Sequence, residues 1–298
     1  MCFGSMLFKL AFKRGKEGAA VMKPGSSLGD KLMGDRFQEL HDLIVENRNK
    51  LKEIKHEDVQ IETADGLKLS GWFFDAGSKN TAIIVHGYRS QAWTDGVTHA
   101  WRFFEHGYNV LISDNRACGA SEGEYLTFGV RESEDIARWA EWVSKRVPNG
   151  NTVLLGISLG GATVSMCSAL DIPGLRVVVE DCAYKTMRWE FEHMMKLFVH
   201  FVPKHSINVA EKIAKKRLGF DFESQSPIES IKIAKYPVFF VHGKADSFIP
   251  YTSAEELYAV CPTDKQLLLV DNCGHGGSQL AGDEYFLPIL SFVDKYCK

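Results

Sequence analysis

Three features are missing from this sequence: an excess of charge of one sign, a Cys-x-x-Cys pair, and an apolar run long enough to cross a bilayer. The 35 Lys and Arg residues face 38 Asp and Glu residues, which gives a net charge of −3 at pH 7. No broad basic field is therefore available to bind nucleic acid. Seven cysteines are scattered along the chain: Cys2, Cys118, Cys167, Cys182, Cys261, Cys273 and Cys297. Such an odd, dispersed set is typical of reduced thiols rather than of a disulfide framework, so we expect a cytoplasmic protein.

The N-terminal end carries a short apolar segment, residues 6–12, which contains Lys9 and is followed by Lys13 and Arg14. The segment is too short to span a bilayer, and a signal peptide would have its basic residues first. We expect a disordered or packed arm here. A weak contact with a membrane surface is the less favoured alternative.

The chain has 298 residues, of which 45% are hydrophobic and 24% charged, as is typical of a globular protein with a sizeable core. No repeat of fixed period is present, which excludes solenoids and propellers. Apolar residues at helical spacing predict a helix over residues 28–51. Strict alternation over residues 59–63 and 67–72, around the turn dipeptide Asp65-Gly66, predicts an antiparallel hairpin.

After the hairpin, continuous apolar runs replace the alternating pattern, as expected of strands that are buried on both faces. These runs are residues 81–85, 110–113, 152–155, 177–179, 238–241 and 267–270. Helical patterns lie between many of them, at residues 95–105, 130–147, 159–170 and 253–260. The alternation of strand and helix predicts an α/β fold with a doubly wound, mostly parallel sheet.

The interval between Val179 and Val238 is much longer than an ordinary connection between a strand and a helix. A helix rich in aromatic residues and methionine is predicted over residues 187–201. Ser206 then stands where it would cap a further helix that runs to Leu218.

We interpret residues 185–230 as a small helical cap, with a plain peripheral pair of helices as the alternative. The cap is inserted into a main domain of residues 59–298. Residues 1–58 precede that domain as an N-terminal arm and helix.

Residues 156–160, Gly-Ile-Ser-Leu-Gly, form a Gly-x-Ser-x-Gly motif between a predicted buried strand and a predicted helix. This motif is weak by itself but strong in that setting. It predicts a sharp turn that holds Ser158 in a strained conformation, with its hydroxyl exposed at the carboxyl edge of the sheet. A serine hydroxyl needs a base to take its proton, and the base needs an acid to orient it.

Two loops supply these partners. Asp246 follows the next-to-last predicted strand, and His275 follows the last one. Both should lie at the same carboxyl edge as Ser158. The order Ser158, Asp246, His275 is the one that this architecture uses for nucleophile, acid and base.

With these motifs in this order, the sequence resembles the α/β-hydrolase superfamily. More narrowly, it is similar to the intracellular serine hydrolases of the serine-aminopeptidase-like and acyl-esterase type. The resemblance spans residues 59–298. It implies that Ser158 is the nucleophile, His275 the general base and acid, and Asp246 the orienting carboxylate. Asp181, which follows an earlier strand, is the rival for the acid.

An oxyanion that forms when serine attacks a carbonyl needs backbone donors aimed at it. One should be the amide of Leu159, directly after the nucleophile. The resemblance places the other at the amide of Tyr88, in the segment His86-Gly87-Tyr88. It also implies that His86 is structural rather than catalytic.

Residues 114–123 resemble the family's Asp-x-Arg-x-x-Gly-x-Ser loop, which supports the neighbourhood of the nucleophile. We expect Asp114 and Arg116 to form a structural ion pair. Ala117 stands where glycine is common in that loop. Cys118 and Cys182 lie in segments near the site, and we interpret them as small buried hydrophobic residues.

No phosphate-binding loop, strand-linked Gly-x-Gly-x-x-Gly or His-Glu-x-x-His helix is present. Cys273 and His275 lack a further Cys or His pair at ligand spacing. We therefore expect neither a cofactor nor a metal.

These features together predict a carboxylesterase that works through an acyl-enzyme on a small-molecule ester or acyl substrate. A set of apolar side chains would suit an uncharged substrate and forms our predicted pocket: Trp93, Trp189, Phe191, Met194 and Phe198. Tyr88 lies in the neighbouring oxyanion segment.

Two other functions stay open. The same three residues cleave amides and peptides in related enzymes, and a peptidase would need an anchor for a substrate amine, for which Glu190 and Glu192 are candidates. A non-catalytic binding protein of the same fold is the other alternative, although an intact set of catalytic residues argues against it. The sequence leaves the oligomeric state open.

Overall fold

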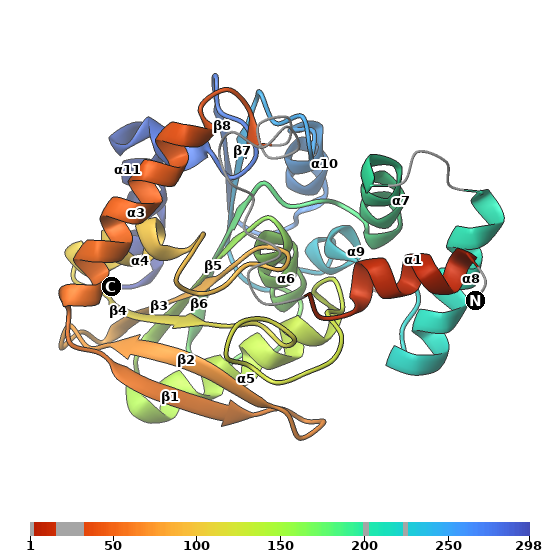
Figure 1. Ribbon diagram of the computed structural model, residues 1–298. Helices are drawn as coiled ribbons and strands as arrows, with labels where there is room; N and C mark the ends of the chain where they lie inside the picture. The colour runs from red at the N-terminus through yellow and green to blue at the C-terminus, as the bar shows by residue number, and fades with distance from the viewer. Residues whose placement is uncertain (1–2, 16–32, 199–202, 223–225) are drawn as a thin grey trace.

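The computed structural model describes residues 3–15, 33–198, 203–222 and 226–298. Its centre is an eight-stranded sheet of order β1-β2-β4-β3-β5-β6-β7-β8 (Figure 1). The strands are β1 (Glu57–Glu62), β2 (Lys68–Phe74), β3 (Asn80–Val85), β4 (Asn109–Ser113), β5 (Asn151–Ile157), β6 (Leu175–Asp181), β7 (Val238–Gly243) and β8 (Lys265–Val270). β1 pairs antiparallel with β2, and β2 antiparallel with β4, whereas β3 to β8 run parallel to one another. The predicted mostly parallel sheet with an N-terminal hairpin is confirmed.

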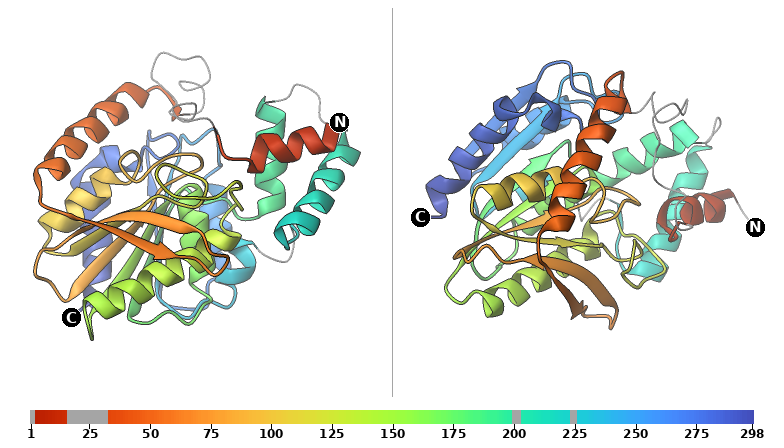
Figure 2. Two further views of the ribbon diagram at one scale, coloured as in Figure 1. Left: turned by 60° about the horizontal axis from the view of Figure 1, so that its bottom comes forward. Right: turned by 60° about the vertical axis from the view of Figure 1, so that its left-hand side comes forward.

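Helices cover both faces of the sheet, which is why its central strands are apolar throughout (Figure 2). In β3, Ile83 and Val85 enter one core, while Ala82 and Ile84 enter the other. The first core includes side chains of α5 (Val130–Arg146), α6 (Leu159–Cys167), α9 (Pro227–Ile231) and α10 (Thr252–Val260). The second includes side chains of α3 (Phe37–Glu53), α4 (Val97–Glu105) and α11 (Asp283–Tyr296). The sheet is therefore doubly wound, as predicted.

In its described part, the predicted N-terminal helix is interrupted before Phe37. α3 starts at Phe37, and the turn before it contains Gly34 with a φ of 83°. This left-handed conformation ends any helical path through that residue. Residues 28–32 of the predicted helix lie outside the described residues.

The long interval between β6 and β7 contains α7 (Met187–Phe198), α8 (Lys204–Leu218) and α9. α7 follows the prediction up to Phe198, and the predicted residues 199–201 lie outside the described part. The expectation for Ser206 is wrong. Pro203 occupies the N-cap position of α8, and Ser206 lies in the first turn, where its amide donates to the carbonyl of Pro203 over 2.8 Å. The sequence pattern does not predict α9 or α11.

The N-terminal arm forms a helix, α1 (Phe3–Phe12), that packs against α8 (Figure 1). Its apolar face is buried within the protein: Leu7, Phe8, Ala11 and Phe12. The ring of Phe12 contacts five other rings, those of Phe8, Phe128, Phe191, Phe220 and Phe222. Residues 3–15 are thus a packed arm, and a weak membrane-surface contact stays a prediction for the exposed Met6 and Leu10.

Polar contacts also join this arm to loops of the main domain. The hydroxyl of Tyr88 donates to the carbonyl of Ala11 over 2.7 Å. The guanidinium of Arg14 donates to the carbonyls of Gly119 and Ser121, each over 2.6 Å. Within the described ranges, no helix is long and apolar enough to cross a membrane.

Candidate active site

Ser158 stands at the junction of β5 and α6, at the carboxyl edge of the sheet (Figure 1). Its backbone has φ 58° and ψ −117°, a conformation that L-residues rarely adopt. The chain is packed tightly around it. A Cβ at Gly156 would lie 2.1 Å from the carbonyl oxygen of Gly160, and one at Gly160 would lie 2.1 Å from that of Val85. Both glycines of the motif are therefore required by close backbone approach.

The structure brings Ser158, His275 and Asp246 together. Nε2 of His275 lies 2.8 Å from Oγ of Ser158, and Nδ1 of His275 lies 2.7 Å from Oδ2 of Asp246. The side chains come from the loops after β5, β7 and β8, which are neighbours of β6 or of each other in the sheet. An Nδ1–H that donates to Asp246 leaves Nε2 free to accept the proton of Ser158.

The carboxylate of Asp246 is buried, and both of its oxygens have polar partners. Its Oδ1 accepts hydrogen bonds from the amides of Phe248 and Ile249, each over 2.8 Å, and Oδ2 lies 3.2 Å from Nε2 of His242. Burial opposes the negative charge, but the attraction of His275 and the hydrogen bonds outweigh it. The pKa of Asp246 is therefore below its usual range. This carboxylate is suited to hold an imidazolium.

The pKa of His275 is shifted in the opposite direction from that of Asp246. Burial lowers the pKa of the ring, but the adjacent carboxylate of Asp246 more than compensates, and the pKa of His275 is raised above its ordinary value. The ring of Phe248 packs edge-on against it at a centroid distance of 4.9 Å. His275 is thus positioned on two sides, by a carboxylate and by an aromatic ring.

Asp181, the rival acid, occupies a different set of hydrogen bonds. Its Oδ2 accepts from the hydroxyl of Tyr285 over 2.8 Å, and its Oδ1 accepts from the hydroxyl of Ser278 over 3.3 Å. Burial raises the pKa of Asp181 to about 6. Asp246, and not Asp181, is hydrogen-bonded to His275.

The two amides expected to stabilise an oxyanion flank Ser158. Leu159 is the first residue of α6, and Gly87, next to Tyr88, is so near that a Cβ on it would lie 3.5 Å from Cβ of Ser158. Across the described residues, neither the amide of Tyr88 nor that of Leu159 has a backbone or side-chain acceptor. Both N–H groups are available to a ligand.

His86 accepts a hydrogen bond from the amide of Asn115 at Nε2, over 2.9 Å, and its Nδ1 lies 2.8 Å from the carbonyl oxygen of Gly87. Both ring nitrogens are therefore engaged with backbone groups. His86 is therefore hydrogen-bonded to the backbone of neighbouring loops and not to the hydroxyl of Ser158.

The expected ion pair between Asp114 and Arg116 is wrong. Arg116 donates to both oxygens of Asp135, each over 2.7 Å, and also to Asp65. Asp114 instead accepts from the amides of Ala92 and Ala120. The side chains of Asp114 and Arg116 point to different parts of the fold, because the loop that carries them turns sharply.

That turn also explains the departure at Ala117. Its φ is 58°, a conformation in which glycine has no steric penalty. Cys118 and Cys182 are buried free thiols, consistent with our interpretation of them as small hydrophobic residues.

The predicted pocket set divides into three groups. Trp189, Phe191 and Met194 lie on α7, where Phe191 and Met194 are buried in the first core and Trp189 packs against it. Phe198 is also on α7, but its side chain lies outside the described part. Trp93 lies apart from the α7 residues: its ring packs with those of His56, Trp72 and Phe74, in the aromatic cluster beside the strand hairpin. Its place in the pocket stays a prediction.

α7 reaches the neighbourhood of the triad through a row of rings. Trp189 stacks on His193 at a centroid distance of 4.8 Å, and His193 lies 5.9 Å from Phe248, which contacts His275. The sequence interpretation missed His193 and Phe248. The pattern offered no signal for them, since their roles depend on α7 lying beside the loop after β7.

Cys182, Asp246 and His275 place one potential metal ligand each within 4.8 Å of one another. Burial raises the pKa of the Cys182 thiol well above its ordinary value, whereas a metal ligand must be a thiolate. Oδ2 of Asp246 and Nδ1 of His275 are also joined by their mutual hydrogen bond. This donor set does not suit a metal ion.

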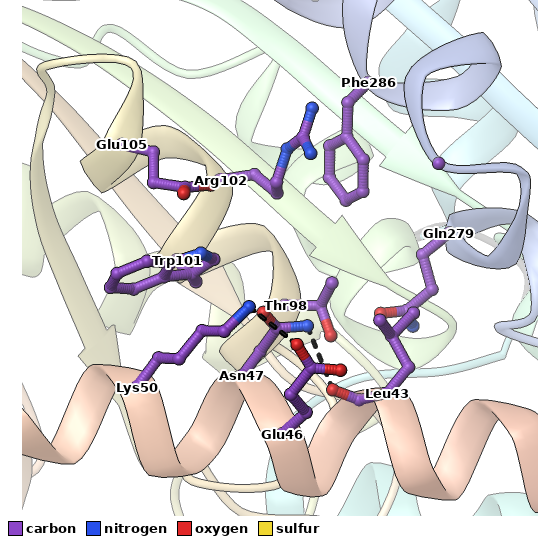
Figure 3. A pocket seen from close by; sticks show the side chains of 11 residues that line it. Leu43, Glu46, Asn47, Lys50, Thr98, Trp101, Arg102, Glu105, Gln279 and Phe286 are labelled. Atoms are coloured by element: carbon purple, nitrogen blue, oxygen red, sulfur yellow. Dashed lines mark hydrogen bonds and ion pairs between the residues drawn. The ribbon is translucent and has the colours of Figure 1, made fainter.

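A separate pocket of about 200 Å³ lies between α3, α4 and α11 (Figure 3). Trp101 and Phe286 supply apolar walls, and Glu46 and Lys50 form an ion pair at its edge. Two buried acceptors in its lining, Oγ1 of Thr98 and Oε1 of Gln279, have no hydrogen-bond partner in the described structure. None of the predicted site residues lines it.

Comparison with known proteins agrees with this architecture. Residues 83–196 match the model of the X-Pro dipeptidyl-peptidase (S15) family. The chain is 25% identical over 238 residues to the uncharacterised protein YqkD of Bacillus subtilis, an alignment that covers 78% of each chain. It is 26% identical over 248 residues to the uncharacterised protein YfhR of Escherichia coli, covering 80% of each.

Among solved structures, an esterase of Pyrococcus furiosus, Pf2001, superposes with a TM-score of 0.68 at 24% identity. The superposition covers 84% of this chain and 94% of that one. A peptidase family model and an esterase structure both support a hydrolase. The protein therefore has the α/β-hydrolase fold, and it is similar to the hydrolases named above.

Proposed function

We propose that the protein is a serine hydrolase that cleaves carboxylic esters with Ser158, His275 and Asp246. The observation that carries the proposal is the chain of short hydrogen bonds from Asp246 through His275 to the hydroxyl of a strained serine. A surface serine and histidine that meet by chance would not include a buried, ionised carboxylate as the third member.

In the proposed mechanism, Ser158 attacks the ester carbonyl while Nε2 of His275 takes its proton. Asp246 stabilises the imidazolium, and the amides of Tyr88 and Leu159 donate to the oxyanion. His275 then gives its proton to the leaving alcohol, which leaves an acyl group on Ser158. Water, deprotonated by the same ring, releases the acid and restores the serine.

We further propose that the helices of residues 185–230 act as a cap over this site. The ring contacts that run from Trp189 through His193 and Phe248 to His275 support it, because they connect α7 with the base. The apolar residues of α7 suit an acyl group. The scattered free thiols support our expectation that the protein works in the cytoplasm.

The test uses p-nitrophenyl esters from acetate to palmitate, with the wild type and Ser158→Ala. We expect Ser158-dependent hydrolysis, and labelling of the wild type but not of the variant by a fluorophosphonate. Full activity in Ser158→Ala would overturn the assignment, and absence of both turnover and labelling would favour a binding role.

The acid is tested with the same esters. Asp246→Asn should lower kcat by roughly four orders of magnitude through loss of tautomer control. Asp181→Asn should have the smaller effect, because Asp181 is bonded to Tyr285 and Ser278 instead. The reverse ranking would make Asp181 the orienting acid.

Amide hydrolysis is the other candidate function, and the match of residues 83–196 to a peptidase family favours it. A panel of aminoacyl-p-nitroanilides separates the two. Cleavage of the anilides without hydrolysis of the esters would assign the protein to the peptidases.

A further inference from the structure

The pocket between α3, α4 and α11 contains polar atoms that the protein itself does not pair (Figure 3). Thr98 and Gln279 are each 2% exposed, yet Oγ1 of Thr98 and Oε1 of Gln279 make no hydrogen bond within the described residues. Buried polar atoms are normally hydrogen-bonded, because the loss of contact with water is otherwise uncompensated. The two atoms therefore mark the pocket as a place where a ligand can complete hydrogen bonds.

The side-chain amide of Gln279 is held in one orientation. Its Nε2 donates to the carbonyl of Gly276 over 3.0 Å, so Oε1 is the end of the amide that faces the pocket without a partner. An amide oxygen only accepts, and a ligand must supply an N–H or O–H to it. The hydroxyl of Thr98 can donate as well as accept, and it can therefore pair with a carbonyl oxygen.

The walls of the pocket suit a flat apolar body. Trp101 and Phe286 line it together with the aliphatic side chain of Leu43 (Figure 3). A cation lies over each ring, Lys50 at 5.7 Å and Arg102 at 4.8 Å from its centre, which holds the rings in place. The volume of about 200 Å³ is below the roughly 300–1,000 Å³ of pockets for drug-sized ligands. A molecule with a single ring and one polar group is the size that fits.

The charged side chains that line the pocket favour a neutral ligand. Lys50 pairs with Glu46 over 2.7 Å, and Arg102 pairs with Asp283 over 2.7 Å. Glu105, the remaining charged residue of the lining, is exposed to water. A charged ligand would have to compete for a residue that is already paired or hydrated, whereas a neutral one need not.

We propose that this pocket binds a neutral primary carboxamide carried on a single ring. The N–H of the carboxamide donates to Oε1 of Gln279, and its carbonyl oxygen accepts from the hydroxyl of Thr98. The ring packs against Trp101 and Phe286. This binding site lies outside the proposed triad, and the proposal holds whether or not the protein cleaves esters.

Benzamide is the probe, and acetophenone, in which a methyl group replaces the NH2 of the amide, is its matched control. NMR of the isotope-labelled protein follows the indole N–H of Trp101 and the side-chain amide of Gln279. Benzamide should shift both signals in a saturable way. Acetophenone should bind about 5-fold more weakly, because Oε1 of Gln279 then gains no donor. No shift, shifts confined to Trp189 of α7, or equal affinities of the two probes would overturn the proposal.

Two variants of Thr98 test the other contact. Thr98→Val keeps the shape of the side chain without the hydroxyl, and it should raise the Kd of benzamide about 5-fold, whereas Thr98→Ser should stay near the wild-type value. Because no described residue pairs with this hydroxyl, Thr98→Val should have a Tm equal to or above that of the wild type. Equal Kd values in the two variants, or a clear drop in the Tm of Thr98→Val, would overturn the proposed contact and with it the carboxamide site.

Discussion

The hydrogen-bond chain through His275 makes the protonation of one imidazole decisive for the proposed reaction. Nε2 accepts the proton of Ser158 only when the ring is neutral. The carboxylate of Asp246 raises the pKa of His275 above its ordinary value against the effect of burial. The residue that orients the base therefore also sets the pH range in which it works.

We accordingly expect kcat/KM to fall as the pH drops through the raised pKa of His275. Asp246→Asn removes the charge that raises this pKa, so the acid limb of the residual activity should move to lower pH. The pH-rate profiles of the two proteins measure this. An acid limb that keeps its position in the variant would mean that another group sets it.

Ser158 is the residue at which function and stability conflict. Its φ of 58° and ψ of −117° cost about 1–3 kcal/mol for an L-residue. Glycine would relieve this strain. Its larger conformational entropy in the unfolded chain would offset about 0.5–1 kcal/mol of that gain in stability.

Ser158→Gly should therefore raise the free energy of unfolding by about 1 kcal/mol, while it abolishes turnover. Urea denaturation measures the change. Ser158→Ala is the matched control, since it keeps the Cβ and with it the strain. Equal stabilities of the two variants would contradict a strained nucleophile.

Among the elements, α1 shows how a short terminal helix is held by the rest of the chain. Ten residues are too few for a stable isolated helix, so tertiary contacts must supply its stability. The rings around Phe12 belong to α7, to the loop before α5 and to the segment after α8. Through these contacts, α1 joins the proposed cap to the main domain.

Phe12→Ala should lower the free energy of unfolding by about 3–5 kcal/mol, because it opens a cavity among these rings. Met6→Ala, at an exposed position of the same helix, should change it by less than about 0.5 kcal/mol. Urea denaturation of both variants tests the difference. Similar small losses would mean that α1 is only loosely attached.

On the scale of the whole molecule, the buried cysteines report on the integrity of both cores. Six thiols are free and buried, and burial raises the pKa of several of them, including Cys118, Cys167 and Cys297. A buried neutral thiol is a poor nucleophile.

Titration of the native protein with a chromogenic disulfide should therefore find these six thiols slow to react, and addition of denaturant should release all of them. Cys2 lies outside the described residues, so the titration uses a Cys2→Ser variant, in which only these six thiols remain. Rapid reaction of several thiols in the native variant would show that a core opens readily.

The sequence by itself determined the features that depend on local pattern. Continuous apolar runs marked the central strands because both faces of those strands are buried. The spacing of Gly156, Ser158 and Gly160 marked the turn because only glycine permits such close backbone approach. The order of Ser158, Asp246 and His275 indicated their meeting because parallel strands bring their carboxyl ends to one edge.

Only the tertiary structure decided which side chains become partners across long stretches of chain. Arg116 pairs with Asp135 and Asp65 rather than with Asp114, and Trp93 packs beside the hairpin instead of the cap. Glu190 and Glu192 look alike in the sequence, yet Glu190 is buried with its Oε2 lacking a hydrogen bond, and Glu192 is partly exposed beside Arg188. Local pattern cannot separate such cases, because burial and pairing depend on how distant elements pack.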